Sequence, residues 1–226
     1  MKLSFLFCLG LLCTARLSTA ATVSTLSSAH AGYTNATWNL WVAQAFQVSS
    51  MAPAFLVTSV RVPLIVLDPN LNFVVRVVGS LSTNPNAPDV ANIRATLSSS
   101  GSQVQGTTVQ VLEFTPEAGE SSQPLEGDKR YWVIMGNTGP DFDQGNTAGR
   151  YAWSYTNTNV PAAGPTDEIA ILNIVAESGT AGTDWVVLNL SPQRIGISLT
   201  PVPEPGSTGL LLLATGLVSR RRRSPR

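Results

Sequence analysis

Two acidic side chains and one amide lie close together in the segment Asp141-Phe-Asp143-Gln-Gly-Asn146. Several oxygen ligands in a tight turn are what calcium, a hard cation, requires. The segment departs from the EF-hand pattern because glycine occupies the fifth position and no later glutamate is in register. A solvated turn therefore fits these residues better, with Asp141, Asp143 and Asn146 as a candidate calcium site. We predict no other metal site and no cofactor.

A second group of carboxylates belongs to one acidic loop and consists of Glu117, Glu120, Glu126 and Asp128. A glycosidase needs two carboxylates that face each other across a cleft. Sequence spacing does not reveal such a geometry, and solvated loop charge is the interpretation that we favour.

Nucleophilic and zinc chemistry both lack their usual residues. His30 is the one histidine of the chain, and it has no neighbouring Asp, Cys or second His in the sequence. A zinc site or a histidine-based triad needs such partners. The chain also has no Gly-x-Ser-x-Gly nucleophile elbow. We therefore expect no enzymatic activity, and an extracellular hydrolase is the third of three function hypotheses.

Three aromatic residues, Tyr151, Trp153 and Tyr155, alternate in one short segment. In a strand, alternate side chains project to the same face, so these rings would form a stripe. Large aromatic rings are usually buried, although an exposed stripe can stack on sugar rings. The small residues between them suit an exposed opposite face, which favours the core interpretation. The stripe remains a candidate glycan-binding platform, for which Trp153→Ala would abolish polysaccharide retention in a folded domain.

The elements that must position these residues are predicted to be β-strands. Apolar, β-branched segments alternate with turn residues, and no stretch of ten residues between the hydrophobic ends has helical periodicity. Pro63 interrupts one apolar segment, which predicts an edge strand or a bulge. This pattern favours an antiparallel β-sandwich of the jelly-roll type. Strands are expected within 38–48, 57–67, 73–81, 93–97, 107–114, 130–135, 150–156, 168–176, 184–190 and 194–200.

The first 21 residues have the features of a cleaved signal peptide with a short helix. A basic start at Lys2 precedes an apolar run, and Ser18-Thr19-Ala20 supplies the small residues that signal peptidase requires. We expect cleavage after Ala20 or Ala21. Because both cysteines of the chain lie in this segment, we expect the mature protein to have no disulfide.

The last 26 residues combine a proline-rich stop, an apolar run and an arginine cluster. Prolines 201, 203 and 205 should end the preceding strand. As a helix, the uncharged run 207–218 would span about 18 Å, well short of the ~30 Å hydrocarbon core. It therefore predicts a temporary membrane hold, with the arginines on the cytoplasmic side. The apolar and basic residues of this tail are Leu210, Leu211, Leu212, Leu213, Leu217, Val218, Arg220, Arg221, Arg222 and Arg223.

Removal of both ends changes the charge of the chain. The region 22–200 contains seven basic and thirteen acidic residues, a net charge of about −6. Nucleic acid is therefore disfavoured as a partner.

The tail resembles a known sorting signal. Val202-Pro203-Glu204-Pro205, followed by the short apolar run and the terminal arginines, is similar to the PEP-CTERM signal of bacterial exosortase substrates. The resemblance implies that a membrane-embedded exosortase recognises Pro203, Glu204 and Pro205 and processes the exported protein. It also implies a bacterium that makes exopolysaccharide.

The middle of the chain has a weaker resemblance to the "choice-of-anchor" surface domains. The segments that carry it are 42–48, 56–62, 130–136, 151–155 and 184–185. These β-rich domains are attached to interchangeable C-terminal anchors and have no assigned catalytic residues, so no catalytic residue can be transferred to this chain.

The sequence thus predicts three parts, a signal peptide (1–21), an extracellular β-domain (22–200) and a sorting signal (201–226). The expected function is that of a non-enzymatic surface or extracellular-matrix protein. Its expected partners are signal peptidase, exosortase and, transiently, the inner membrane. The alternative function is a carbohydrate-binding module that engages exopolysaccharide through the aromatic stripe.

Overall fold

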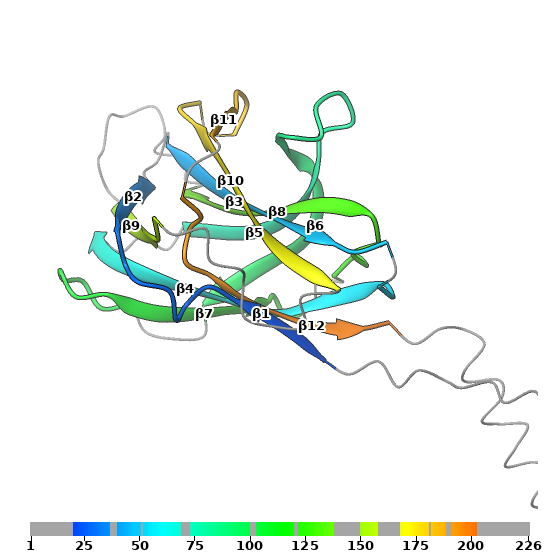
Figure 1. Ribbon diagram of the computed structural model, residues 1–226. Coiled ribbons are helices and arrows are strands. Elements are labelled where there is room, and N and C mark those ends of the chain that lie inside the picture. The colour runs from blue at the N-terminus through cyan, green and yellow to red at the C-terminus, as the bar shows by residue number, and fades with distance from the viewer. Residues whose placement is uncertain are drawn as a thin grey trace, which may run out of the picture. The chain divides into compact units, whose positions relative to one another are not determined.

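The computed structural model describes residues 20–36, 40–50, 52–68, 73–99, 103–119, 122–137, 150–157, 168–180, 182–188 and 191–202. These residues belong to one compact unit that runs from Ala20 to Val202. The described part consists of β-strands and connections, without a helix, which confirms the prediction of an all-β, antiparallel fold (Figure 1). Accordingly, it contains no helix long and apolar enough to cross a membrane. The helices expected at the two ends of the chain lie outside the described residues.

Twelve strands form the described fold, and they pair in the order β1-β12-β4-β7-β6-β5-β8-β3-β10-β11, while β9 joins β2 to β4. The resulting sheet curls around its own core in the manner of a half-barrel (Figure 1). The strands are β1 (Ala21–Ser24), β2 (Gly32–Ala36), β3 (Trp41–Val48), β4 (Phe55–Asp68), β5 (Phe73–Ser80), β6 (Pro88–Ser99), β7 (Gln110–Pro116), β8 (Lys129–Asn137), β9 (Arg150–Tyr155), β10 (Ile169–Ser178), β11 (Val186–Leu188) and β12 (Gly196–Pro201).

Strand β4 organises the sheet because it changes partners along its length. On one side it pairs with β12 as far as Arg61 and then with β9 from Leu64 onward. Pro63 lies in the gap between these two ladders, where its missing N–H removes no bond from either. The predicted edge position is therefore wrong. Pro63 is buried in a strand that has partners on both sides, since it also pairs with Val111 of β7.

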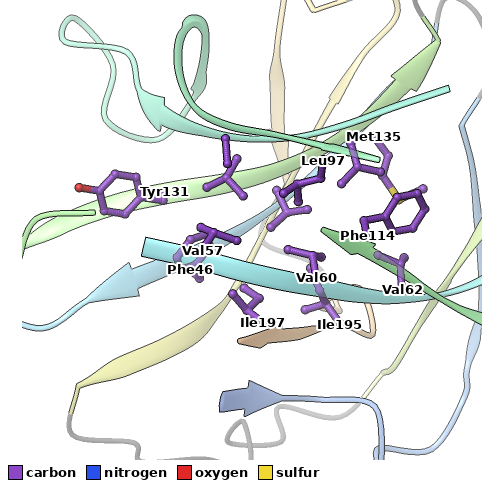
Figure 2. Close-up of a cluster of buried hydrophobic side chains, with 14 of the residues drawn as sticks. Phe46, Val57, Val60, Val62, Leu97, Phe114, Tyr131, Met135, Ile195 and Ile197 are labelled. Carbon is purple, nitrogen blue, oxygen red and sulfur yellow. The ribbon is translucent and has the colours of Figure 1, made fainter. Parts of the chain in front are cut away.

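The main core fills the inside of the curl. Nearly every strand contributes to it, because alternate side chains point inward. Figure 2 shows side chains from opposite sides of the curl in one cluster. Its labelled members are Phe46, Val57, Val60, Val62, Leu97, Phe114, Tyr131, Met135, Ile195 and Ile197.

A second, smaller cluster covers the outer face of β3, β5, β8 and β10. Trp41 lies flat against Gly136 of β8, and Gly182 of the β10–β11 connection packs against the same indole. Val90, Trp185 and other partly buried residues pack around this cluster. Strands β3 and β8 are therefore buried on both faces. The cluster consists of Trp41, Ala43, Ala45, Val78, Trp132, Ile134 and Ala176.

The described strands form one hydrogen-bonded network, whereas a sandwich would consist of two separate sheets. Register shifts interrupt the pairing of β5 with β6, of β3 with β10 and of β4 with β9. Such irregularities bend a strand and increase its twist. They explain how a continuous sheet can curl over a single core.

Candidate functional site

The predicted aromatic stripe lies on β9, and two of its rings are in the core. Trp153 is 0% exposed and Tyr151 is 1% exposed. Trp153 Nε1 donates a hydrogen bond to the backbone oxygen of Arg194 at 2.9 Å, and the Tyr151 ring stacks on Phe73 with centroids 3.8 Å apart. Tyr155 is half-buried. The rings of Tyr151 and Trp153 are therefore not available to a sugar, which argues against a platform of three rings and agrees with the core interpretation for these two.

The opposite face of the β2–β9 pair brings together residues that are far apart in the sequence. Ser154 of β9 points to this face, where its hydroxyl lies 2.9 Å from His30 Nδ1. Arg194 Nη1 donates to the same hydroxyl oxygen at 3.3 Å. Tyr33 of β2 pairs with Ser154 across the ladder, so its side chain lies on the same face. We call His30, Tyr33, Ser154 and Arg194 the His30–Arg194 cluster.

The backbone holds this cluster in position. Arg194 N donates to Ser154 O at 2.8 Å, and Ala31 N donates to Tyr155 O at 2.9 Å. Arg194 Nη2 also donates to Leu26 O. The β1–β2 connection that carries His30 is thus fastened to β9 and to the segment that leads into β12.

Ser154 is a hydrogen-bond partner of both His30 and Arg194. A guanidinium can only donate, so the Ser154 oxygen accepts from Arg194. A serine hydroxyl has one hydrogen and two acceptor lone pairs, so at 2.9 Å it either donates to His30 Nδ1 or accepts from it. A neutral imidazole that accepts at Nδ1 carries its hydrogen on Nε2. One that donates from Nδ1 leaves Nε2 as an acceptor, so in either tautomer Nε2 takes no part in the hydrogen bond to Ser154.

Exposure differs sharply within the cluster. Ser154 is fully buried, whereas Tyr33 is 38% exposed and His30 is also exposed. The His30 and Tyr33 rings lie 4.3 Å apart between centroids and are tilted by 42°. A buried hydroxyl is poorly placed to attack a substrate, although a serine beside a base is the first requirement of nucleophilic catalysis. The cluster is thus better suited to binding than to catalysis.

The three segments that meet at the cluster contain basic residues but no acidic ones, although the region 22–200 is acidic as a whole. Segments 20–36, 150–157 and 191–202 contain no Asp or Glu. Over the described ranges the one ion pair is that of Lys129 with Glu126, so Arg194 has no carboxylate partner there. Its Nε atom is buried and also lacks a hydrogen-bond partner within the described structure.

The acidic loop shows no pair of facing carboxylates among its described members. Glu126 forms an exposed ion pair with Lys129, which lowers the pKa of Glu126 and raises that of Lys129. Asp128 is exposed in a left-handed turn conformation, with φ of 59°, and Glu117 is half-buried. Glu120 lies outside the described residues. Solvated loop charge, the interpretation favoured from the sequence, describes Glu126 and Asp128 as the structure places them.

Other predicted sites fall mainly on undescribed residues. Asp141, Asp143 and Asn146, as well as the tail from Pro203 onward, lie outside the structure's described ranges. Val202 is described, and its N–H donates to Ala54 O at 2.8 Å. Across the described ranges, no group of three His, Cys, Asp or Glu side chains could hold a metal ion.

Sequence reasoning dismissed His30 and did not single out Tyr33, Ser154 or Arg194 as a site. Contact between His30 and Ser154 spans 124 positions, so no local motif could reveal it. The sequence does show that segments 20–36, 150–157 and 191–202 contain no Asp or Glu, and this shared feature is the signal that could have pointed to the cluster. No protein-family model matches the chain, and no curated protein or solved structure matches it either.

Proposed function

We propose that the chain is the precursor of an exported surface or extracellular-matrix protein without catalytic activity. In this proposal signal peptidase removes the N-terminal segment, and an exosortase recognises Pro203, Glu204 and Pro205 and processes the tail. The inner membrane holds the tail only transiently. The mature domain then resides at the cell surface or in an extracellular polysaccharide matrix.

The observation that best supports this proposal is the pairing of the first and last strands. Strands β1 and β12 are antiparallel neighbours, with Ala21 opposite Leu199 (Figure 1). The folded unit therefore begins at Ala20 and ends at Val202 on the same side of the sheet. The proposed signal peptidase site and the proposed exosortase motif lie next to these two ends of the folded unit. Either end of the chain can therefore be removed or retained without interrupting the fold.

The burial of Ala21 refines the proposed N-terminus. Ala21 is 2% exposed and is the first residue of β1. Cleavage after Ala20 retains the whole strand, whereas cleavage after Ala21 removes a buried residue. We therefore propose that the mature chain begins at Ala21.

The finer description of the fold also belongs to this proposal. We infer that the curled sheet is a jelly-roll-like derivative of a β-sandwich, in which opposite sides pack face to face. Support comes from the main core, where Val60 of β4 and Val133 of β8 belong to the same cluster although four strand-to-strand steps separate β4 from β8 in the sheet.

N-terminal sequencing and intact mass of the protein from its producing bacterium test the proposal. The expected product starts at Ala21 and lacks the terminal arginines. A strain without the exosortase should retain those arginines. A chain that keeps residues 1–20 would contradict export through a cleaved signal peptide.

A further inference from the structure

The His30–Arg194 cluster has three properties that together suit one class of ligand. It presents exposed aromatic rings, the donor hydrogens of Arg194 and a positive charge that has no carboxylate partner among the described residues. We propose that this cluster binds carboxylate-bearing sugars, such as the uronate units of an acidic polysaccharide. The proposal concerns the folded domain alone and does not depend on how the tail is processed.

The aromatic contribution comes from Tyr33 and His30. Tyr33 is exposed on the outer face of β2 and packs against His30 at a centroid distance of 4.3 Å. Exposed aromatic rings offer a large apolar area at a small cost in side-chain entropy. A sugar ring can therefore lie against this pair, which is not possible at the buried Trp153.

The main polar contribution comes from the guanidinium of Arg194, which can only donate. His30 Nδ1 is engaged with the Ser154 hydroxyl, and Nε2 takes no part in that hydrogen bond. Arg194 uses one hydrogen of Nη1 for Ser154 and one of Nη2 for Leu26 O. Nε is buried, so the second hydrogens of Nη1 and Nη2 are the ones that remain for a ligand. Donors of this kind match carboxylate and hydroxyl oxygens.

Charge selects the acidic sugar over a neutral one. The segments around Arg194 contain no Asp or Glu, although the region 22–200 is acidic as a whole. A partly buried cation without a counter-ion is costly, and an anionic ligand relieves that cost. Arginine also recognises planar carboxylates more specifically than lysine does.

Isothermal titration calorimetry of the purified protein with trigalacturonate tests the proposal, with maltotriose as the neutral sugar and acetate as the bare carboxylate. We expect trigalacturonate to bind, and we expect its affinity to fall as the salt concentration increases. Maltotriose and acetate should each bind at least about tenfold more weakly, because each lacks one of the two contributions.

Variants separate the two contributions. Tyr33→Ala should weaken trigalacturonate binding about tenfold, whereas Tyr33→Phe retains the ring and should bind like the wild type. Arg194→Gln should abolish the salt dependence and most of the affinity. Arg130→Gln is the matched control, because it removes an equal charge from a residue that contacts Pro85 and Asn86 instead.

Three results would overturn the proposal. The first is a failure of trigalacturonate to bind the wild-type protein. The second is wild-type affinity in both Tyr33→Ala and Arg194→Gln. The third is equal affinity for maltotriose, which would contradict the assignment to acidic sugars. Tyr33→Ala keeps the test valid if Arg194→Gln does not fold, since the Tyr33 side chain is exposed.

Discussion

Substitution of Gly136 by alanine should destabilise the protein, because the indole of Trp41 occupies the space that a Cβ would need. An alanine Cβ at this position would lie 2.5 Å from Trp41 Nε1 and still closer to Cδ2 and Cε2. Side-chain Cβ atoms essentially never approach another heavy atom to less than 3.0 Å. Either the indole or strand β8 must therefore move.

The surroundings of Trp41 leave the ring little room to move. Trp41 is 6% exposed, and a Cβ at Gly182 would lie 3.0 Å from the indole Cε3. Overpacking of a well-packed core costs about 1–3 kcal/mol. We expect Gly136→Ala to lower the free energy of unfolding by this amount.

Urea unfolding followed by circular dichroism measures the effect through the transition midpoint at an unchanged slope. Gly179→Ala is the matched control, because a Cβ there meets nothing within 4 Å. The control should be neutral or stabilising by up to about 1 kcal/mol.

A double-mutant cycle identifies the cause. Trp41→Ala alone should cost about 3–5 kcal/mol, as buried aromatic truncations do. In the Trp41→Ala background, Gly136→Ala should cost almost nothing, because the clashing ring is gone. Wild-type stability of Gly136→Ala, or additive losses in the double mutant, would refute the packing argument.

Three further predictions concern buried polar groups. Gln44→Leu should lower the free energy of unfolding in urea by about 2–4 kcal/mol, because Gln44 is fully buried and its Oε1 accepts from Gln193 N at 2.7 Å. Unchanged stability would contradict a stabilising role of this hydrogen bond. Trp153→Phe should cost about 2–4 kcal/mol in the same assay, since the backbone oxygen of Arg194 loses its donor and the smaller ring leaves a cavity. An exposed platform residue would show no loss of stability. Burial raises the pKa of Tyr131 above its ordinary value of 10.0. The neutral Tyr131 side chain therefore stabilises the fold fully below pH 10.0, and this stabilisation is lost as the pH rises through the higher folded-state pKa. Unfolding midpoints of Tyr131→Phe should therefore fall less steeply above this pH than those of the wild type, and equal slopes would count against the shift.

The alternation of side chains between the two faces of a strand was predictable from the sequence. The rings of Tyr151 and Trp153 share one face of β9, as period-two geometry requires. Trp41, Ala43 and Ala45 likewise share one face of β3. The all-β class follows from the same local signals, because the turn residues and β-branched segments leave no room for a helix.

The partners of each strand were not predictable. Pro63 was expected at an edge or a bulge, but it is tolerated because β12 pairs with β4 before it and β9 pairs with β4 after it. The His30–Arg194 cluster depends in the same way on β9 and β12 meeting the β1–β2 connection. Such contacts are set by long-range pairing, which leaves no trace in local periodicity.

The most direct test of the proposed function is the intact mass of the mature protein from wild-type cells and from cells that lack the exosortase. The proposal predicts a wild-type product that begins at Ala21 and has lost the arginines of the tail, and a mutant product that retains them. A chain that ends at Arg226 in both strains would contradict the proposal.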